Sequence, residues 1–322
     1  MSIRRKPAAR ALRRRLAAVF DAGMGWLTLA IIRAIRLTDR RRAAGFAGWF
    51  MRKLGPWLPE HGLGRANLVA AFPDKPPAEI ERILAGVWDN LGRVAAEFAH
   101  LDRIRFQRLA FLPDDVVPRA LQGDEVVYDR DSEERARRML ASGKGGLLFA
   151  AHLGNWELPA LVGPSLGVDT AVLFRRPNIR GAADAILSVR SPIMGKLVPT
   201  GIGAPVELLH LLQANCHVGM LVDQHHEKGV EVTFFGRRCR ANPLLARLAR
   251  HAECPIHGVR IVRLPDGNRF WGEITEPIEP PRDAEGRIDV QGTMQAITAI
   301  VEAWVREHPE QWLWLHRRWR PS

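Results

Sequence analysis

The residues with the clearest capacity for chemistry are His152 and Glu157, in the stretch "GGLLFAAHLGNWE" at residues 145–157. An apolar run of strand length ends at His152, and Glu157 follows five positions later. A carboxylate that accepts a hydrogen bond from one imidazole nitrogen fixes the tautomer and stabilises the imidazolium. The pair therefore predicts a general base that deprotonates a substrate hydroxyl. A purely structural His–acid pair is the alternative that this motif leaves open.

The elements that must position this pair are predicted to be strands and helices in alternation. Beyond Gly143, helical stretches separate apolar runs of strand length at residues 146–153, 169–174, 197–201 and 217–223. Such alternation is typical of βαβ units and predicts an α/β fold with a largely parallel central sheet flanked by helices. Residues 256–275 add two strands around a turn at Pro265, Asp266 and Gly267.

In a parallel sheet, functional groups gather at the carboxyl ends of the strands, so His152 is expected to project from that edge. Gly154 allows a tight turn, and Asn155 is a suitable N-cap for a helix beginning there. Glu157 would then lie in the first turn of that helix. From this position we expect its carboxylate to reach back to the imidazole.

An N-terminal helical region is predicted to precede the sheet. Residues 1 to about 140 favour helices, and between Ile80 and Val94 apolar residues recur every three or four positions. We expect three parts: a basic amphipathic membrane-association segment at 1–45, a helical region packed on the core at 46–140, and an α/β core at 141–322.

Charge predicts an anionic partner. The 322 residues carry a formal net charge of +12, which suits nucleic acid, a lipid surface or an acidic protein. Seven Lys and Arg residues precede an apolar segment at residues 22–32. A helix needs about 20 apolar residues to cross a bilayer, so these eleven predict a helix lying on an anionic membrane. A secretory signal peptide and a plain cytosolic helix with a solvated basic face are the alternatives.

Several ordered motifs carry a family resemblance. "HLGNWE" at residues 152–157 resembles the H-x4-D/E motif of glycerolipid-type acyltransferases, in the form found in late acyltransferases of lipid A biosynthesis. Further elements resemble that family in the same order: "ANLVAAFP" at 66–73, "FRRPN…R…G…VP" at 174–199, "LVDQ…FFG" at 221–236 and "PEQWLWLHRRWR" at 309–320. The resemblance covers residues 40 to about 320.

The resemblance implies transfer of a fatty acyl chain from an acyl carrier protein or coenzyme A thioester to a hydroxyl of a lipid A precursor. It places the protein at the cytoplasmic face of the bacterial inner membrane, peripheral or monotopic, and requires no cofactor and no metal. His152 is the expected base and Glu157 its partner. The candidate substrate-binding residues are Arg176, Asp223, Asn155, Arg190 and Gln224. Another glycolipid, a lysophospholipid or an amino-acid lipid is an open alternative for the acceptor.

Attack on a thioester creates an oxyanion, for which backbone N–H groups after His152 or the Arg176 guanidinium are the expected donors. Arg176 could instead form an ion pair with Asp223. The arginines after "FFG" and in the C-terminal tail suit acceptor phosphates or an acidic carrier protein, or else a solvated face. The tryptophans of "WLWLHRRWR" suit either a membrane interface or the core.

Other motifs point to rival chemistries that we reject. "GPSLG" matches a serine nucleophile elbow, but Ser165 follows a predicted helix and precedes a strand, which is the reverse of an elbow. In "DQHHE", His225 and His226 are adjacent and lack the spacing of a zinc site. Three cysteines without C-x-x-C spacing favour a reducing compartment, with Cys216 as a packed thiol. A nucleic-acid-binding protein would explain the basic charge but leave the His152 motif without a role.

Overall fold

The computed structural model describes residues 6–112, 122–177 and 180–320. Within them a seven-stranded sheet has the order β1-β9-β8-β2-β5-β3-β4. Its strands are β1 (Val126–Tyr128), β2 (Leu147–Ala150), β3 (Thr170–Phe174), β4 (Lys196–Pro199), β5 (His217–Leu221), β8 (Ile256–Arg263) and β9 (Phe270–Ile274). All neighbouring pairs are parallel except β8 and β9, which form an antiparallel hairpin. The predicted α/β fold with a largely parallel sheet is therefore confirmed.

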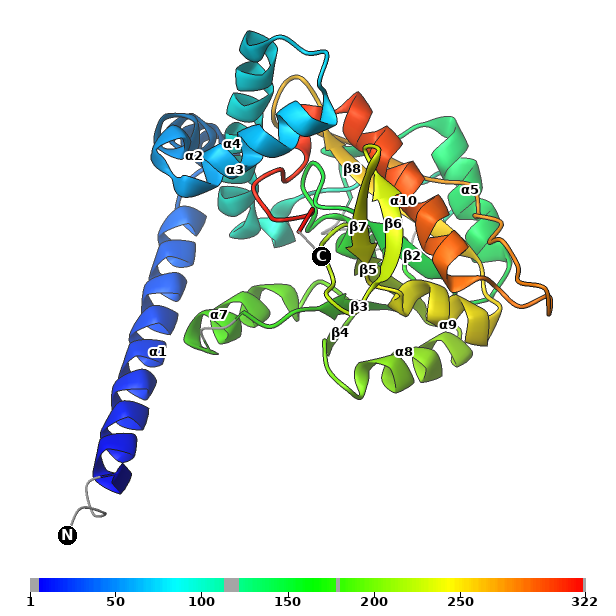
Figure 1. The fold of residues 1–322 in the computed structure, drawn as a ribbon, viewed down its shortest axis with the longest axis horizontal. Coiled ribbons are helices and arrows are strands. Elements are labelled where there is room, and N and C mark those ends of the chain that lie inside the picture. The colour runs from blue at the N-terminus through cyan, green and yellow to red at the C-terminus, as the bar shows by residue number, and fades with distance from the viewer. Residues whose placement is uncertain (1–5, 113–121, 178–179, 321–322) are drawn as a thin grey trace.

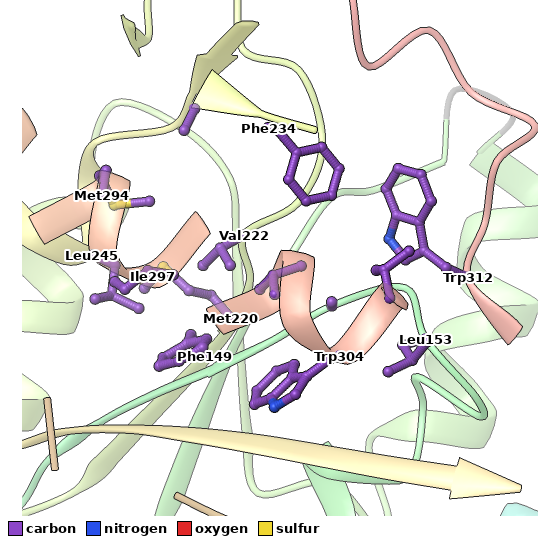
Figure 2. Packing of buried hydrophobic residues seen from close by; sticks show 14 of the residues in the cluster. Phe149, Leu153, Met220, Val222, Phe234, Leu245, Met294, Ile297, Trp304 and Trp312 are labelled. Atoms are coloured by element: carbon purple, nitrogen blue, oxygen red, sulfur yellow. The ribbon is translucent and has the colours of Figure 1, made fainter. Parts of the chain in front are cut away.

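Helices cover both faces of this sheet. On one face pack α8 (Ala204–Gln213), α9 (Leu244–Ala252) and α10 (Val290–Glu307), and on the other α5 (Arg130–Ala141) and α6 (Pro159–Ser165). Figure 2 shows the first layer, in which Phe149 of β2 stacks on Trp304 of α10 with ring centroids 5.5 Å apart. Strand β2 is buried except for the partly buried Leu148, so the backbone that leads to His152 has a rigid support.

The N-terminal helices are α1 (Lys6–Arg36), α2 (Arg40–Leu54), α3 (Pro59–Ala71) and α4 (Pro77–Phe98). Asp39 caps α2 by accepting a hydrogen bond from the backbone N–H of Arg42 at 3.0 Å. Helix α2 packs along α4, whereas α1 extends away from the sheet and contacts α7 (Arg180–Arg190) (Figure 1). No helix in the described ranges has the length and hydrophobicity needed to cross a membrane. Arg4 and Arg5 of the predicted basic segment lie outside the described residues.

Several elements differ from the sequence expectation. Strand β1 lies inside the region predicted to be helical, because a three-residue strand pairs with β9 and has no periodicity of its own. The helix expected from Asn155 begins only at Pro159, after a series of turns. The hairpin of β6 (Val230–Phe234) and β7 (Arg237–Ala241), like α10, was not predicted.

Candidate active site

The imidazole of His152 is paired with the carboxylate of Asp223. His152 follows β2 by two residues and Asp223 follows β5 by two residues, and Ala150 and Leu221 at the ends of these strands are in register. The neighbouring parallel strands thus bring the two side chains together. His152 Nδ1 lies 2.8 Å from Asp223 Oδ1. An ionised carboxylate only accepts, so Nδ1 carries the proton and Nε2 presents its lone pair.

This geometry corrects the expectation that Glu157 orients the imidazole. Residues 155–158 form turns in place of the first helical turn, and Gly154 redirects the chain with a φ of +57°. The Glu157 carboxylate accepts hydrogen bonds from Arg190 Nε at 2.8 Å and Arg190 Nη2 at 2.5 Å. Glu157 therefore forms a bidentate ion pair with Arg190, and Asp223 takes the place beside His152.

The Asp223 carboxylate is buried and held by three donors. Its Oδ2 accepts hydrogen bonds from the backbone N–H of His152 at 2.8 Å and from Trp312 Nε1 at 2.7 Å. Burial by itself raises the pKa of the Asp223 carboxyl, but the imidazole of His152 and the hydrogen bonds outweigh this effect and hold the pKa below its usual value. The carboxylate is thus kept ionised, as stabilisation of an imidazolium requires.

His152 Nε2 faces a cavity of about 630 Å³. The side-chain nitrogen Nε2 of Gln224 lies 3.2 Å from His152 Nε2, within hydrogen-bond distance of this basic nitrogen. Beyond His152 the cavity passes over the sheet face and under α6, and much of its wall is apolar: Leu148, Ala160, Val172, Met194, Leu197 and Val259. A basic nitrogen at the rim of an apolar cavity suits proton transfer beside a bound hydrocarbon chain.

Of the remaining predicted site residues, some line the cavity and Asn155 supports the loop after His152. Arg176 is exposed and, with Arg190, lines the cavity. The alternative ion pair between Arg176 and Asp223 is not formed, because the Asp223 oxygens bond to His152 and Trp312.

Asn155 was expected to bind substrate, and the structure corrects this expectation. Its side chain is fully buried, and its Nδ2 donates to Glu97 Oε2 at 2.8 Å. Glu97 is itself fully buried and accepts two hydrogen bonds from the buried Arg263. Asn90 of the same network donates to the carbonyl of Gly154 at 2.8 Å. Asn155 thus holds the loop after His152 from behind and does not line the cavity.

The structure gives the surroundings of two residues that we rejected as catalytic, Ser165 and Cys216. Ser165 is buried at the end of α6, where its hydroxyl donates to the carbonyl of Val162 at 2.7 Å. Cys216 is buried, and burial raises the pKa of its thiol, so it is a packed cysteine of low reactivity. Within the described part of the chain, no three or more His, Cys, Asp or Glu side chains are grouped so that they could hold a metal ion.

Sequence reasoning missed the role of Trp312 and the pairing role of Asp223. Trp312 and Trp314 belong to the core and are almost fully buried, which selects the core alternative for these two tryptophans. The available signal was the position of Asp223 at the end of the predicted strand 217–223. This position indicates a partner for His152 only if the strand order is known. In the sheet β2 lies beside β5, although β3 and β4 lie between them in the chain.

The family model for bacterial lipid A biosynthesis acyltransferases matches residues 12–321, nearly the full chain. A search of curated proteins found no match.

Proposed function

The chain belongs to the bacterial lipid A biosynthesis acyltransferase family, and from this premise we propose that it is an O-acyltransferase acting on a lipid A precursor. The donor is the thioester of an acyl carrier protein or coenzyme A, and the acceptor is a hydroxyl of the precursor. The observation that carries the proposal is His152 Nε2 at the rim of an apolar cavity, with Nδ1 bonded to a buried carboxylate.

The reaction follows from this pair. His152 Nε2 removes the proton of the acceptor hydroxyl as its oxygen bonds to the thioester carbonyl carbon, and Asp223 stabilises the resulting imidazolium. The tetrahedral intermediate then collapses, the carbon–sulfur bond breaks, and the imidazolium returns its proton to the departing thiolate. The products are the ester and the free thiol, and no acyl-enzyme is formed.

The oxyanion of that intermediate needs a hydrogen-bond donor. The backbone N–H groups of Leu153 and Gly154 already donate to the carbonyls of Ala151 and Gln311, at 2.7 and 3.0 Å. The side chains of Arg176 and Gln224 line the same cavity as His152, and Gln224 lies beside its imidazole, so we assign the oxyanion donor to one of these two.

The apolar part of the cavity is proposed to hold the acyl chain. Each buried methylene contributes about 0.8 kcal/mol, so a cavity of fixed depth favours one chain length. The cations at the cavity mouth, Arg175 and Arg176, are exposed and suit the phosphates of the acceptor or the acidic surface of a carrier protein.

Membrane attachment at the cytoplasmic face of the inner membrane is proposed through α1 and α2. Trp26 of α1 is 74% exposed, and on α2 an aromatic patch of Phe46, Trp49 and Phe50 is exposed, with Phe46 at 66%. Arg52 and Lys53 follow this patch and are exposed. Exposed aromatic rings beside cations are typical of a helix lying in the interface of an anionic bilayer.

The proposal is tested with the purified protein, vesicles of anionic lipid, and labelled acyl carrier protein and coenzyme A thioesters of several lengths. A lipid A precursor, a lysophospholipid and an amino-acid lipid are offered together, and mass spectrometry identifies the acylated product. We expect the precursor to be acylated, and His152→Ala to remain folded but lose transfer by several orders of magnitude. Acylation of another lipid in its place, or turnover that does not need His152, would contradict the proposal.

A further inference from the structure

We propose that Trp312 is a positioning residue that sets the basicity of the His152–Asp223 pair through its indole N–H, an inference that rests on the proposed function. Trp312 Nε1 donates to Asp223 Oδ2 at 2.7 Å, while Asp223 Oδ1 faces the imidazole. The indole thus touches the carboxylate on the side away from the reacting nitrogen. It acts through Asp223 and does not line the cavity.

The chain around Trp312 is bonded to both sides of the His152 loop. Leu153 forms an antiparallel bridge with Trp312, and the N–H of Leu313 donates to the carbonyl of His152 at 3.0 Å. The N–H of Gly154 donates to the carbonyl of Gln311, also at 3.0 Å. These bonds place the indole and the imidazole in one rigid unit, so the orientation of the N–H toward Asp223 is set by backbone contacts.

Packing leaves the indole little freedom. Trp312 is 1% exposed, and its ring contacts Phe234, with ring centroids 5.5 Å apart (Figure 2). It also contacts Trp314, with ring centroids 4.7 Å apart. A donor that cannot rotate away keeps its positive end on the carboxylate throughout a catalytic cycle. Such fixed dipoles are the form in which a protein environment stabilises charge without reorganising.

The electrostatic effect has a definite sign. The indole N–H partly compensates the negative charge of Asp223, which lowers the affinity of the pair for a proton. Without the indole N–H, the imidazolium form of His152 would be favoured. The acid limb of the pH profile of kcat/KM would then move to higher pH. Besides the indole, the charged or titratable groups His152, His316 and Arg318 act on Asp223. Burial lowers the pKa of His316, while the Asp223 carboxylate acts in the opposite direction.

Trp314 offers a matched control. It is fully buried, it packs against Trp312, and its Nε1 donates to the carbonyl of Pro309 at 2.8 Å. Trp314→Phe therefore removes a buried indole N–H of the same kind from the same cluster, but leaves the bond to Asp223 intact.

The experiment compares Trp312→Phe with Trp314→Phe in the full-length protein by kcat and by the pH profile of kcat/KM. We expect Trp312→Phe to raise the acid limb by about one pH unit, the size expected for a hydrogen bond to a charged group, so that kcat/KM falls about tenfold at a pH below the limb. Trp314→Phe should leave the acid limb unchanged. An unmoved limb in Trp312→Phe, or an equal movement in both variants, would overturn the inference.

Two additions keep the test decisive. If Trp312→Phe does not fold, 3-benzothienylalanine at position 312 keeps the ring shape and lacks only the N–H. Titration of His152 by nitrogen NMR of histidine-labelled protein reads the same pKa without turnover. If the wild type transfers no acyl group, the proposed function fails, but a raised pKa of His152 in the variant still supports the role of Trp312 and an unchanged one refutes it.

Discussion

Gly219 should control which acyl chain the protein accepts. It lies at the centre of β5, in register with Leu148 of β2 and Val172 of β3, and all three line the cavity. A β-carbon at Gly219 would have only the carbonyl oxygen of Ala171 nearby, at 3.9 Å. The space above Gly219 is therefore open, and a larger side chain would occupy cavity volume without displacing protein atoms.

Gly219→Val adds three carbon atoms to that space. If they exclude three methylenes of the acyl chain, at about 0.8 kcal/mol each, the loss is about 2.4 kcal/mol, or about 60-fold in kcat/KM. Gly219→Ala adds one carbon and should cost about fourfold by the same relation. Valine favours strands and glycine weakens them, so we expect neither variant to lower the melting temperature.

The assay measures kcat/KM for a series of saturated acyl thioesters with wild type, Gly219→Ala and Gly219→Val. The preferred length should become shorter in steps, while the shortest donors, which do not reach Gly219, keep wild-type rates and serve as the internal control. Equal slowing of every donor would mean that the substitution disturbs the sheet. An unchanged length preference would refute the assignment of the cavity to the acyl chain.

Three further outcomes follow from the described contacts. Asp223→Asn should lower kcat by about 10⁴, the order seen when an amide replaces the acid beside a catalytic histidine, as measured by acyl-transfer kinetics. Glu97→Gln leaves the buried Arg263 without its charge partner and should destabilise the fold by about 3–5 kcal/mol in chemical denaturation. Trp49→Glu should weaken sedimentation with anionic vesicles about tenfold or more, because it removes an exposed ring from the aromatic patch on α2.

Each of these outcomes has a control in the chain. Glu157→Gln breaks the pair with Arg190 and should move the acid limb of the pH profile much less than Asp223→Asn; the opposite order would restore Glu157 as the partner of His152. Glu253→Gln breaks an exposed pair with Arg282 and should leave the denaturation midpoint almost unchanged. Ile202→Glu changes an exposed residue before α8, and an equal loss of vesicle binding there would show that the aromatic patch is not the contact.

Periodicity and local motifs were sufficient to predict the fold class of this protein and the position of His152. Alternating apolar runs and helical stretches predicted the α/β fold, since a strand buried on both faces is apolar throughout and a covering helix is not. The apolar spacing between Ile80 and Val94 predicted a helix there, and the structure has α4 over Pro77–Phe98. The "HLGNWE" motif placed His152 at a strand end, and the ordered motifs pointed to the family that the chain belongs to.

The tertiary structure alone decided which acid serves His152. Glu157 is near it in sequence, but the turns after Gly154 direct Glu157 to Arg190. Asp223 is 71 residues away and becomes the neighbour only because β5 pairs with β2. Strand order depends on how whole helices and strands pack, and short-range patterns carry no record of it. The same holds for Trp312, whose indole N–H reaches Asp223 through the fold of a distant C-terminal segment.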